Sequence, residues 1–405
     1  MRGRTYRLAA LLVPALLLTG LLAFQLPAAQ AQNIGWVRQF GSPQHDAAVS
    51  VAVDPTGHVY VAGWTDGALP GQTSAGGPRD SFVRKYGPDG TETWTRQFGT
   101  PRTDLAMAVA VDPARHVYVV GQVDGALPGQ SSAGEFDAYV RKYDPDGGAA
   151  WTRQFGGPGT DAAAGLVVEP GGDVYVAGWV YGALPGQSPT GQFDAFLRRY
   201  DSNGAESWTR QFGTPDHDRA VRASLVTTGD VEVAAGGSRG NTRRDAFVHR
   251  FGPGGAAGPS RRLQAADTDD VHGVAMDPPG NIHAVGQTDP DHGHAFVRKS
   301  DPSGSLIWER DLHLGDDETI VVDVAVDPAG DVYVAGQVAA DVFVRKYDRN
   351  GRELWTSRLG TPDNDIASAL IVDPTGTVYL VGWTNGAFSG QRSAGLSDAF
   401  LAQLR

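Results

Sequence analysis

Short hydrophobic runs, each bounded by turn residues, recur along nearly the whole chain. One unit reads AVSVAVDPTGHVYVAGW over 48–64 and continues as DSFVRKYGPDGTETWTRQFG over 80–99. The runs are rich in Val, Tyr, Trp and Phe, which is typical of strands. The first two runs are joined by DPTG, in which Pro fixes φ and Gly can adopt a positive φ. The DPDG at 144–147 has the same two residues between the third and fourth runs of a later unit. The unit therefore predicts four antiparallel strands joined by tight hairpins.

Three signals of this unit each occur seven times. The turn between the first two strands starts at residues 54, 112, 169, 227, 277, 327 and 373. The third strand starts at Asp80, Asp137, Asp194, Asp245, His294, Asp341 and Asp398. The fourth strand starts at Trp36, Trp94, Trp151, Trp208, a degenerate site near Arg261, Trp308 and Trp355, at spacings of 47 to 58 residues. Four antiparallel strands at such a period are typical of a propeller blade, so the sequence predicts an all-β, seven-bladed β-propeller.

The order of the strands predicts how the ring closes. The run over 36–40 is a fourth strand with no first three strands before it, and the run over 398–404 is a third strand with no fourth strand after it. Pairing the two closes the ring and removes two open sheet edges. We therefore expect one propeller domain over 32–405.

The repeated motifs resemble a known family. VAVDPxGxVYVAG, DAFVRKYDPxG and WTRQFG are similar to the bacterial seven-bladed propeller repeat called SBBP, and more loosely to NHL-type propellers. The resemblance covers nearly all of 33–405 and implies the fold. For function it implies only exported or cell-surface proteins, most of them without an assigned activity, because this fold hosts enzymes, lectins and scaffolds alike.

The amino terminus and the charge constrain the location and the partners. Three arginines precede an apolar run over 8–24, and Ala-Gln-Ala follows at 29–31, so we expect a signal peptide over 1–31 and a secreted or cell-surface protein. An uncleaved membrane anchor is the alternative, and no other segment is apolar enough to span a bilayer. Without the three arginines of residues 1–31, the chain has 31 basic and 46 acidic residues. Such a surface repels phosphate, so we expect no nucleic-acid partner; we also expect a monomer.

The chain contains no Cys, which excludes disulfides, thiolate catalysis and Cys-ligated zinc. There is also no His-Glu-x-x-His and no Gly-x-Ser-x-Gly motif. Nearly every polar feature recurs with the repeat, whereas a catalytic group is needed once. We therefore assign no catalytic residue.

One Gly- and Pro-rich loop recurs in only part of the ring. DGALPGQTSAG over 66–76 returns at 124–134, 181–191 and 385–395, in units one, two, three and seven. Because the ring closes, these units are neighbours, so the loops predict a raised crescent on one face of the propeller. In one interpretation the Leu-Pro pair folds onto the blade with the preceding Trp as a floor. In the other, an aromatic and amide platform binds a sugar or peptide, formed by Trp64, Trp179, Trp383, Gln72, Gln130, Gln187 and Gln391.

An aspartate also recurs just before most first strands. The set comprises Asp46, Asp104, Asp161, Asp218 and Asp365, with Asp270 and Asp317 as looser counterparts. Because first strands line the central channel, these carboxylates are candidates for a ring at its mouth that binds a cation. Alternatively, each caps backbone N–H groups in a turn.

Units five and six concentrate acidic and imidazole side chains in their connectors. The candidate ligands for calcium or another divalent cation are Asp269, Asp270, His272, Asp289, Asp291, His292 and His294. The other interpretation is solvated loops. From the sequence we expect a non-enzymatic binding or scaffold module for an extracellular glycan, protein or peptide. The alternative is a metal-assisted hydrolase or lyase that uses this sector.

Overall fold

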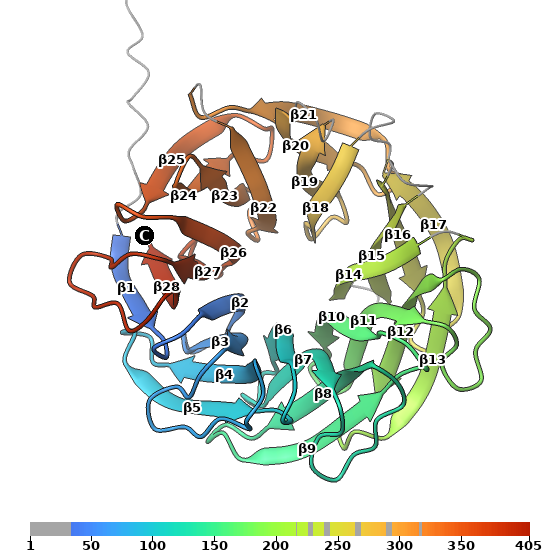
Figure 1. The fold of residues 1–405 in the computed structure, drawn as a ribbon. Coiled ribbons are helices and arrows are strands. Elements are labelled where there is room, and N and C mark those ends of the chain that lie inside the picture. The colour runs from blue at the N-terminus through green and yellow to red at the C-terminus, as the bar shows by residue number, and fades with distance from the viewer. Residues whose placement is uncertain are drawn as a thin grey trace, which may run out of the picture. The chain divides into compact units, whose positions relative to one another are not determined.

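The computed structural model describes residues 34–405, apart from 216, 226–229, 239–243, 264–268, 289–293 and 316–317. In this part of the chain, 28 strands form seven blades around a central channel, which confirms the predicted fold class (Figure 1). No helix among the described residues is long and apolar enough to cross a membrane.

The strands follow the predicted repeat, with blade 1 starting at the first complete unit. Blades 1 to 3 contain β2 (Asp46–Val53), β3 (Val59–Thr65), β4 (Asp80–Tyr86), β5 (Glu92–Phe98), β6 (Asp104–Val111), β7 (Val117–Asp124), β8 (Phe136–Tyr143), β9 (Ala149–Phe155), β10 (Ala162–Val168), β11 (Val174–Tyr181), β12 (Phe193–Tyr200) and β13 (Glu206–Phe212). Blades 4 and 5 contain β14 (His217–Leu225), β15 (Val231–Ser238), β16 (Arg244–Phe251), β17 (Ala257–Leu263), β18 (Asp269–Met276), β19 (Ile282–Thr288), β20 (His294–Ser300) and β21 (Leu306–Leu312). Blades 6 and 7 contain β22 (Thr319–Val326), β23 (Val332–Val338), β24 (Asp341–Tyr347), β25 (Glu353–Leu359), β26 (Asp365–Val372), β27 (Val378–Thr384), β28 (Asp398–Leu404) and β1 (Ile34–Phe40).

The first and last strands lie side by side in blade 7. Strand β1 pairs antiparallel with β28, with Val37 opposite Ala402 and Phe40 opposite Ala399. The strand order of this blade is therefore β26-β27-β28-β1, and its outermost strand comes from the start of the described chain (Figure 1). Unlike the other blades, blade 7 has no hairpin turn between its third and fourth strands.

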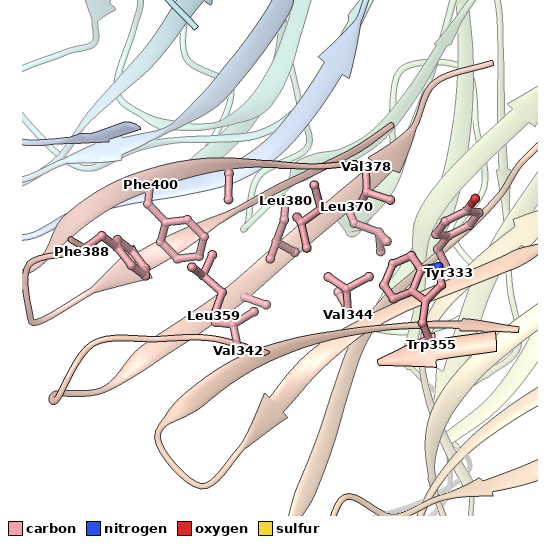
Figure 2. Close-up of a cluster of buried hydrophobic side chains, with 14 residues drawn as sticks. Tyr333, Val342, Val344, Trp355, Leu359, Leu370, Val378, Leu380, Phe388 and Phe400 are labelled. Carbon is pink, nitrogen blue, oxygen red and sulfur yellow. The ribbon is translucent and has the colours of Figure 1, made fainter. Parts of the chain in front are cut away.

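Large apolar side chains fill the space between neighbouring blades. Figure 2 shows the cluster between blades 6 and 7, where Tyr333 and Trp355 lie at one end and Phe388 and Phe400 at the other. The Tyr333 and Trp355 rings are 6.1 Å apart, and the two phenyl rings are 5.2 Å apart. Burial of such aromatic side chains on folding provides most of the free energy that holds the blades together.

The fourth-strand Trp of one blade packs under a turn of the next blade. Gly90, at φ +75°, lies on Trp36: a Cβ added to this glycine would come within 2.9 Å of the indole. In the same contact Arg38 Nε donates to the Gly90 carbonyl at 2.7 Å. Equivalent arginine contacts to the next blade are made by Arg96, Arg153, Arg210 and Arg310. The repeated Trp and Arg therefore assemble the ring.

Candidate functional site

A pair of glutamines fixes each loop of the crescent onto the outer strand of its own blade. In blade 1, the Gln97 side chain accepts the Leu69 N–H at 2.9 Å and donates to Gly67 O at 2.8 Å and to the Asp80 carboxylate at 2.7 Å. In return, Gln72 Oε1 accepts the Gln97 N–H at 3.1 Å. We call this arrangement the glutamine clamp. It recurs with Gln154 and Gln130, with Gln211 and Gln187, and with Gln39 and Gln391.

The fourth-strand glutamine occurs only in the four blades that carry the loop. At the same register position, blades 4, 5 and 6 have Arg262, Asp311 and Arg358. Arg358 therefore occupies the glutamine position of its strand, and Ser357 occupies the position of the inter-blade arginine. The WTRQFG motif contained the signal for the clamp, because its Gln and the loop appear together or not at all.

The apolar residue of each loop is buried, as the structural interpretation predicts. Leu69, Leu127, Leu184 and Phe388 are at most 3% exposed. Leu69 belongs to the same buried cluster as Phe40 and Phe82, whereas Trp64 is not part of that cluster. The aromatic residues that share this cluster with Leu69 are Phe40, Phe82, Tyr86 and Tyr379, with Trp36 partly buried against it, so the expected contact with the preceding Trp64 is not found in blade 1.

The three second-strand tryptophans are only half-buried and lie beside the loops. Arg79 stands over the Trp64 ring at 4.1 Å from its centroid, and Arg219 over the Trp179 ring at 5.0 Å. Trp383 is half-buried as well. The Oε1 atoms of Gln72, Gln130, Gln187 and Gln391 are engaged in the clamps. Binding of a sugar or peptide by these residues stays a prediction.

The connector aspartates are buried at the junctions between blades rather than in the channel. Asp46, Asp104, Asp161 and Asp365 are at most 1% exposed. Each accepts a backbone N–H from the residue four positions earlier at 2.6 Å, as from Ser42 to Asp46. The capping interpretation is confirmed, and the expected ring of carboxylates at the channel mouth is wrong.

Each of these aspartates faces a second carboxylate, which the sequence analysis treated only as a strand marker. The Asp161 and Asp137 carboxylates lie on either side of Gly156, and a Cβ on this glycine would come within 2.3 Å of Asp161 Oδ2 and 2.6 Å of Asp137 Oδ1. Asp137 Oδ1 is buried without a hydrogen-bond partner. The same arrangement joins Asp46 to Asp398 around Gly41 and Asp104 to Asp80 around Gly99.

Burial of these pairs favours the protonated carboxyl. Desolvation, opposed by hydrogen bonds and reinforced by the neighbouring carboxylate, raises the pKa of both Asp104 and Asp161 to about 7. The pKa values of Asp46 and Asp365 are raised for the same main reason. A proton on Asp161 removes the repulsion between the two buried carboxylates, which favours the protonated form at neutral pH and below.

The junction between blades 5 and 6 departs from this rule. His294 stands at the third-strand position of Asp80, and Thr319 at the first-strand position of Asp46. His294 lies against His313, with ring centroids 4.9 Å apart, and Thr319 Oγ1 is buried without a partner. The expected counterparts Asp270 and Asp317 are therefore wrong: register places Asp269 and Thr319 there.

The candidate metal ligands of blades 5 and 6 are only partly visible. Asp289, Asp291 and His292 lie outside the described residues. Asp269 and Asp270 begin β18 and pair with Thr288 and Gln287, and their side chains are not described. Within the described part of the chain, no group of three His, Asp or Glu side chains is placed to hold a metal. A divalent cation in this sector stays a prediction.

The central channel encloses a cavity of about 580 Å³ lined by the first strands. Most of its lining is Val, Ala, Leu, Ile and Met, and among the described polar residues it includes Ser50, His272, Asp323 and Ser368. His272 Nδ1 is 2.6 Å from the Val321 carbonyl oxygen, and Asp323 Oδ2 accepts the Leu370 N–H of the next blade at 3.0 Å. These two polar groups thus connect first strands across blade junctions.

Comparison with known proteins supports the fold and leaves the activity open. The "Beta-propeller repeat" family SBBP matches residues 35–70 and 354–388. The regulatory protein FlaEY of Caulobacter vibrioides is 24% identical over 393 residues, which is 86% of this chain, and this chain spans only 38% of the length of that protein.

Solved propellers of different function are similar in fold. The Pan2 WD40 domain of Neurospora crassa superposes with a TM-score of 0.54 at 13% identity, covering 92% of this chain and 97% of that one. Puromycin hydrolase gives a TM-score of 0.56 at 14% identity over 88% of this chain and 54% of that one. Drosophila Plexin A in complex with Semaphorin 1b gives 0.53 at 10% identity over 93% and 88%. Together with the repeat match, these findings show that the chain is a seven-bladed β-propeller in which two segments, 35–70 and 354–388, match the SBBP repeat.

Proposed function

We propose that this propeller is an exported, non-enzymatic binding module whose crescent of loops holds an extracellular protein, peptide or glycan. The supporting observation is the glutamine clamp. Four clamps fix four adjacent loops, each by hydrogen bonds from both glutamines and by a buried apolar residue. A surface that is ordered before binding loses little conformational entropy when a partner docks, which favours affinity.

The tips of the clamped loops supply the exposed surface for such a partner. The residue directly after each loop glutamine is exposed in all four copies: Thr73, Ser131, Ser188 and Arg392. Small polar side chains on a rigid backbone are adaptable hydrogen-bonding groups, and the half-buried tryptophans beside them add apolar area. The relative FlaEY is described as a regulatory protein, which agrees with a role in binding.

The test begins with glycan and peptide arrays probed with residues 32–405. The triple variant Thr73→Glu, Ser131→Glu, Ser188→Glu keeps every clamp and places negative charge at three exposed tips. We expect it to lose at least tenfold in affinity for any ligand found, whereas Ala114→Glu, in an exposed turn of the opposite face, should bind normally. Equal binding by both variants would contradict the proposal. Metal-dependent hydrolase or lyase turnover by the same preparation would contradict it as well.

Export is tested separately by sequencing the amino terminus of the protein recovered from the medium of a bacterial producer. Cleavage after Ala31 is expected. A protein that stays with the cells and begins at Met1 would favour the membrane anchor instead.

A further inference from the structure

At four junctions between blades, a Trp donates a hydrogen bond to the turn between the third and fourth strands of the next blade. Trp94 Nε1 donates to Pro145 O at 3.1 Å, and the amine of Lys85 reaches the same carbonyl oxygen at 3.0 Å. Trp151 with Lys142, and Trp208 with Arg199, repeat this double contact, and Trp308 repeats the indole bond alone. The acceptor in each case is the carbonyl of the second residue of the four-residue turn.

The glycine at the fourth position of these turns rests on the same indole. A Cβ on Gly147 would come within 2.9 Å of Trp94, and one on Gly204 within 2.7 Å of Trp151. Gly147 also adopts φ +82°, in the left-handed region that favours glycine. Each junction is therefore a receptor for one type of peptide turn, with an indole donor for a carbonyl, joined at three of the four by a Lys or Arg, and a flat aromatic face for a glycine.

The junction between blades 6 and 7 has the receptor but no turn. Lys346 and Trp355 are opposite each other in register, as Lys85 and Trp94 are. Within the described residues, no turn joins the third strand of blade 7, β28, to its fourth strand, β1. Trp355 Nε1 donates to no acceptor among the described residues. A pocket of about 690 Å³ lies at this place, lined by Tyr333, Lys346, Trp355, Asp327, Asp331 and the turn over 374–376.

The junction between blades 7 and 1 serves as a comparison. Trp36 Nε1 also lacks a hydrogen-bond partner there, yet it is buried, and the Gly90 turn covers the indole. The missing bond at Trp355 is different, because its indole lines a pocket. The arginine that holds the turn at other junctions is replaced here by Ser357, which leaves additional room.

We propose that this pocket binds a β-turn of another polypeptide, seated as the turns at the four other junctions are. The carbonyl of the second turn residue accepts from Trp355 Nε1 and from Lys346 Nζ, and the glycine at the fourth position lies on the indole. The pocket is lined by two carboxylates, Asp327 and Asp331, and by one amine, Lys346. Lys346 Nζ is 2.9 Å from Asp331 and 3.8 Å from Asp327, so the lining has an excess of negative charge. The occupant is therefore a turn that carries a basic residue. The site lies at the hairpin turns, so it is separate from the loop crescent of the proposed function.

The chain contains a suitable probe, since the turn Asp348-Arg349-Asn350-Gly351 carries a basic residue and covers Trp308. A disulfide-cyclised peptide, Cys-Asp-Arg-Asn-Gly-Cys, is titrated into residues 32–405 labelled with ¹⁵N at the Trp indoles. The Trp355 resonance is assigned with Trp355→Phe, and we expect it to shift on binding. The control peptide has Ala in place of Gly and should bind at least tenfold more weakly, because its Cβ meets the indole.

Two variants separate the pocket from the rest of the ring. Trp355→Phe keeps the aromatic face and removes the donor, so affinity for the glycine peptide should fall about tenfold. Trp308→Phe removes the equivalent donor under a turn that is present, and should leave peptide affinity unchanged. The proposal is overturned if the Trp355 resonance does not move at millimolar peptide, or if the alanine peptide binds equally well. The latter test needs no protein variant.

A third comparison tests whether residues 32–33 occupy the pocket. Proteins that begin at Gln32 and at Ile34 should bind the cyclic peptide with the same affinity. Binding by the shorter form alone would mean that residues 32–33 fill the pocket, and the proposal for an external turn would fail.

Discussion

The buried aspartate pairs predict that the propeller loses stability as the pH rises through neutrality. The folded protein keeps a proton on Asp161 up to a pKa of about 7, whereas in the unfolded chain the same carboxyl has its ordinary value of 3.8. Because the folded-state pKa is the higher one, the stabilisation is fully present below pH 3.8 and is lost as the pH rises towards 7. Each pH unit between the unfolded and the folded pKa lowers the free energy of unfolding by about 1.4 kcal/mol, so ionisation of Asp161 lowers it by about 4 kcal/mol in all.

The variant Asp161→Asn isolates this contribution. The amide cannot ionise, so the variant lacks the change in charge that the parent side chain undergoes. The amide also has only one oxygen, whereas Asp161 accepts both the Gly157 N–H and the Tyr181 N–H. At pH 4.5 we therefore expect the variant to be about 1 kcal/mol less stable than the parent protein. At pH 8 the parent carboxylate is ionised, and the variant should be more stable by up to about 3 kcal/mol.

Urea unfolding followed by Trp fluorescence at pH 4.5, 5.5, 6.5, 7.5 and 8 measures the difference directly. The matched control is Asp89→Asn, in an exposed turn, where hydrogen bonds from Thr91 lower the pKa of the carboxyl. This control should follow the parent protein over the whole range, because its carboxyl is ionised in both states. If the parent and Asp161→Asn profiles run parallel from pH 4.5 to 8, Asp161 is ionised throughout and the raised pKa is refuted.

Three further predictions concern the clamp, the junction turns and the metal. Gln154→Leu removes the hydrogen bonds to Leu127 N, Gly125 O and Asp137. The loop over 124–134 should therefore lose about 2 kcal/mol of local stability and exchange its amide hydrogens faster. The control Arg358→Leu, in a blade without the loop, should leave amide exchange in the loop over 124–134 unchanged. Gly147→Ala should lower the melting temperature clearly more than Gly71→Ala, because both have φ above +70° but only the former would place a Cβ against an indole. A cation in blades 5 and 6 predicts heat on titration with calcium or zinc that Asp291→Ala abolishes; no heat with the parent protein would exclude that site.

The fold could be predicted because its signals are local. Asp54 and Gly57 close the first hairpin, with the Gly57 N–H donating to Asp54 O at 2.9 Å, and that turn has six relatives along the sequence. Burial of the loop Leu was also predictable, since an apolar side chain in a Gly-rich loop gains free energy by packing against its own blade. Its actual neighbours, Phe40 and Phe82, come from different blades, so they could be named only after the blades were placed.

The carboxylate pairs could not be predicted from these local signals. Asp137 marks a third strand and Asp161 precedes a first strand, and each has its own local explanation as a strand edge or a turn cap. Their contact depends on the angle between blades 2 and 3 and on Gly156, which leaves no side chain between them. The glutamine clamp is different, because the joint presence of Gln97-type residues and loops was visible in the sequence.

In a repeat protein, a contact made at most junctions is explained by assembly, so function is better sought where the contact partner is missing. His294 and Thr319 replace a carboxylate pair, and His294 packs against the His313 ring. Trp355 keeps the donor of the repeated contact, while its junction has no turn to accept it. The same order of strands that closes the ring through β1 and β28 therefore creates the pocket at blades 6 and 7. A circular permutant that joins 404 to 35 through Asp-Arg-Asn-Gly should fill this pocket and abolish binding of the cyclic peptide, while the loop crescent keeps its ligand.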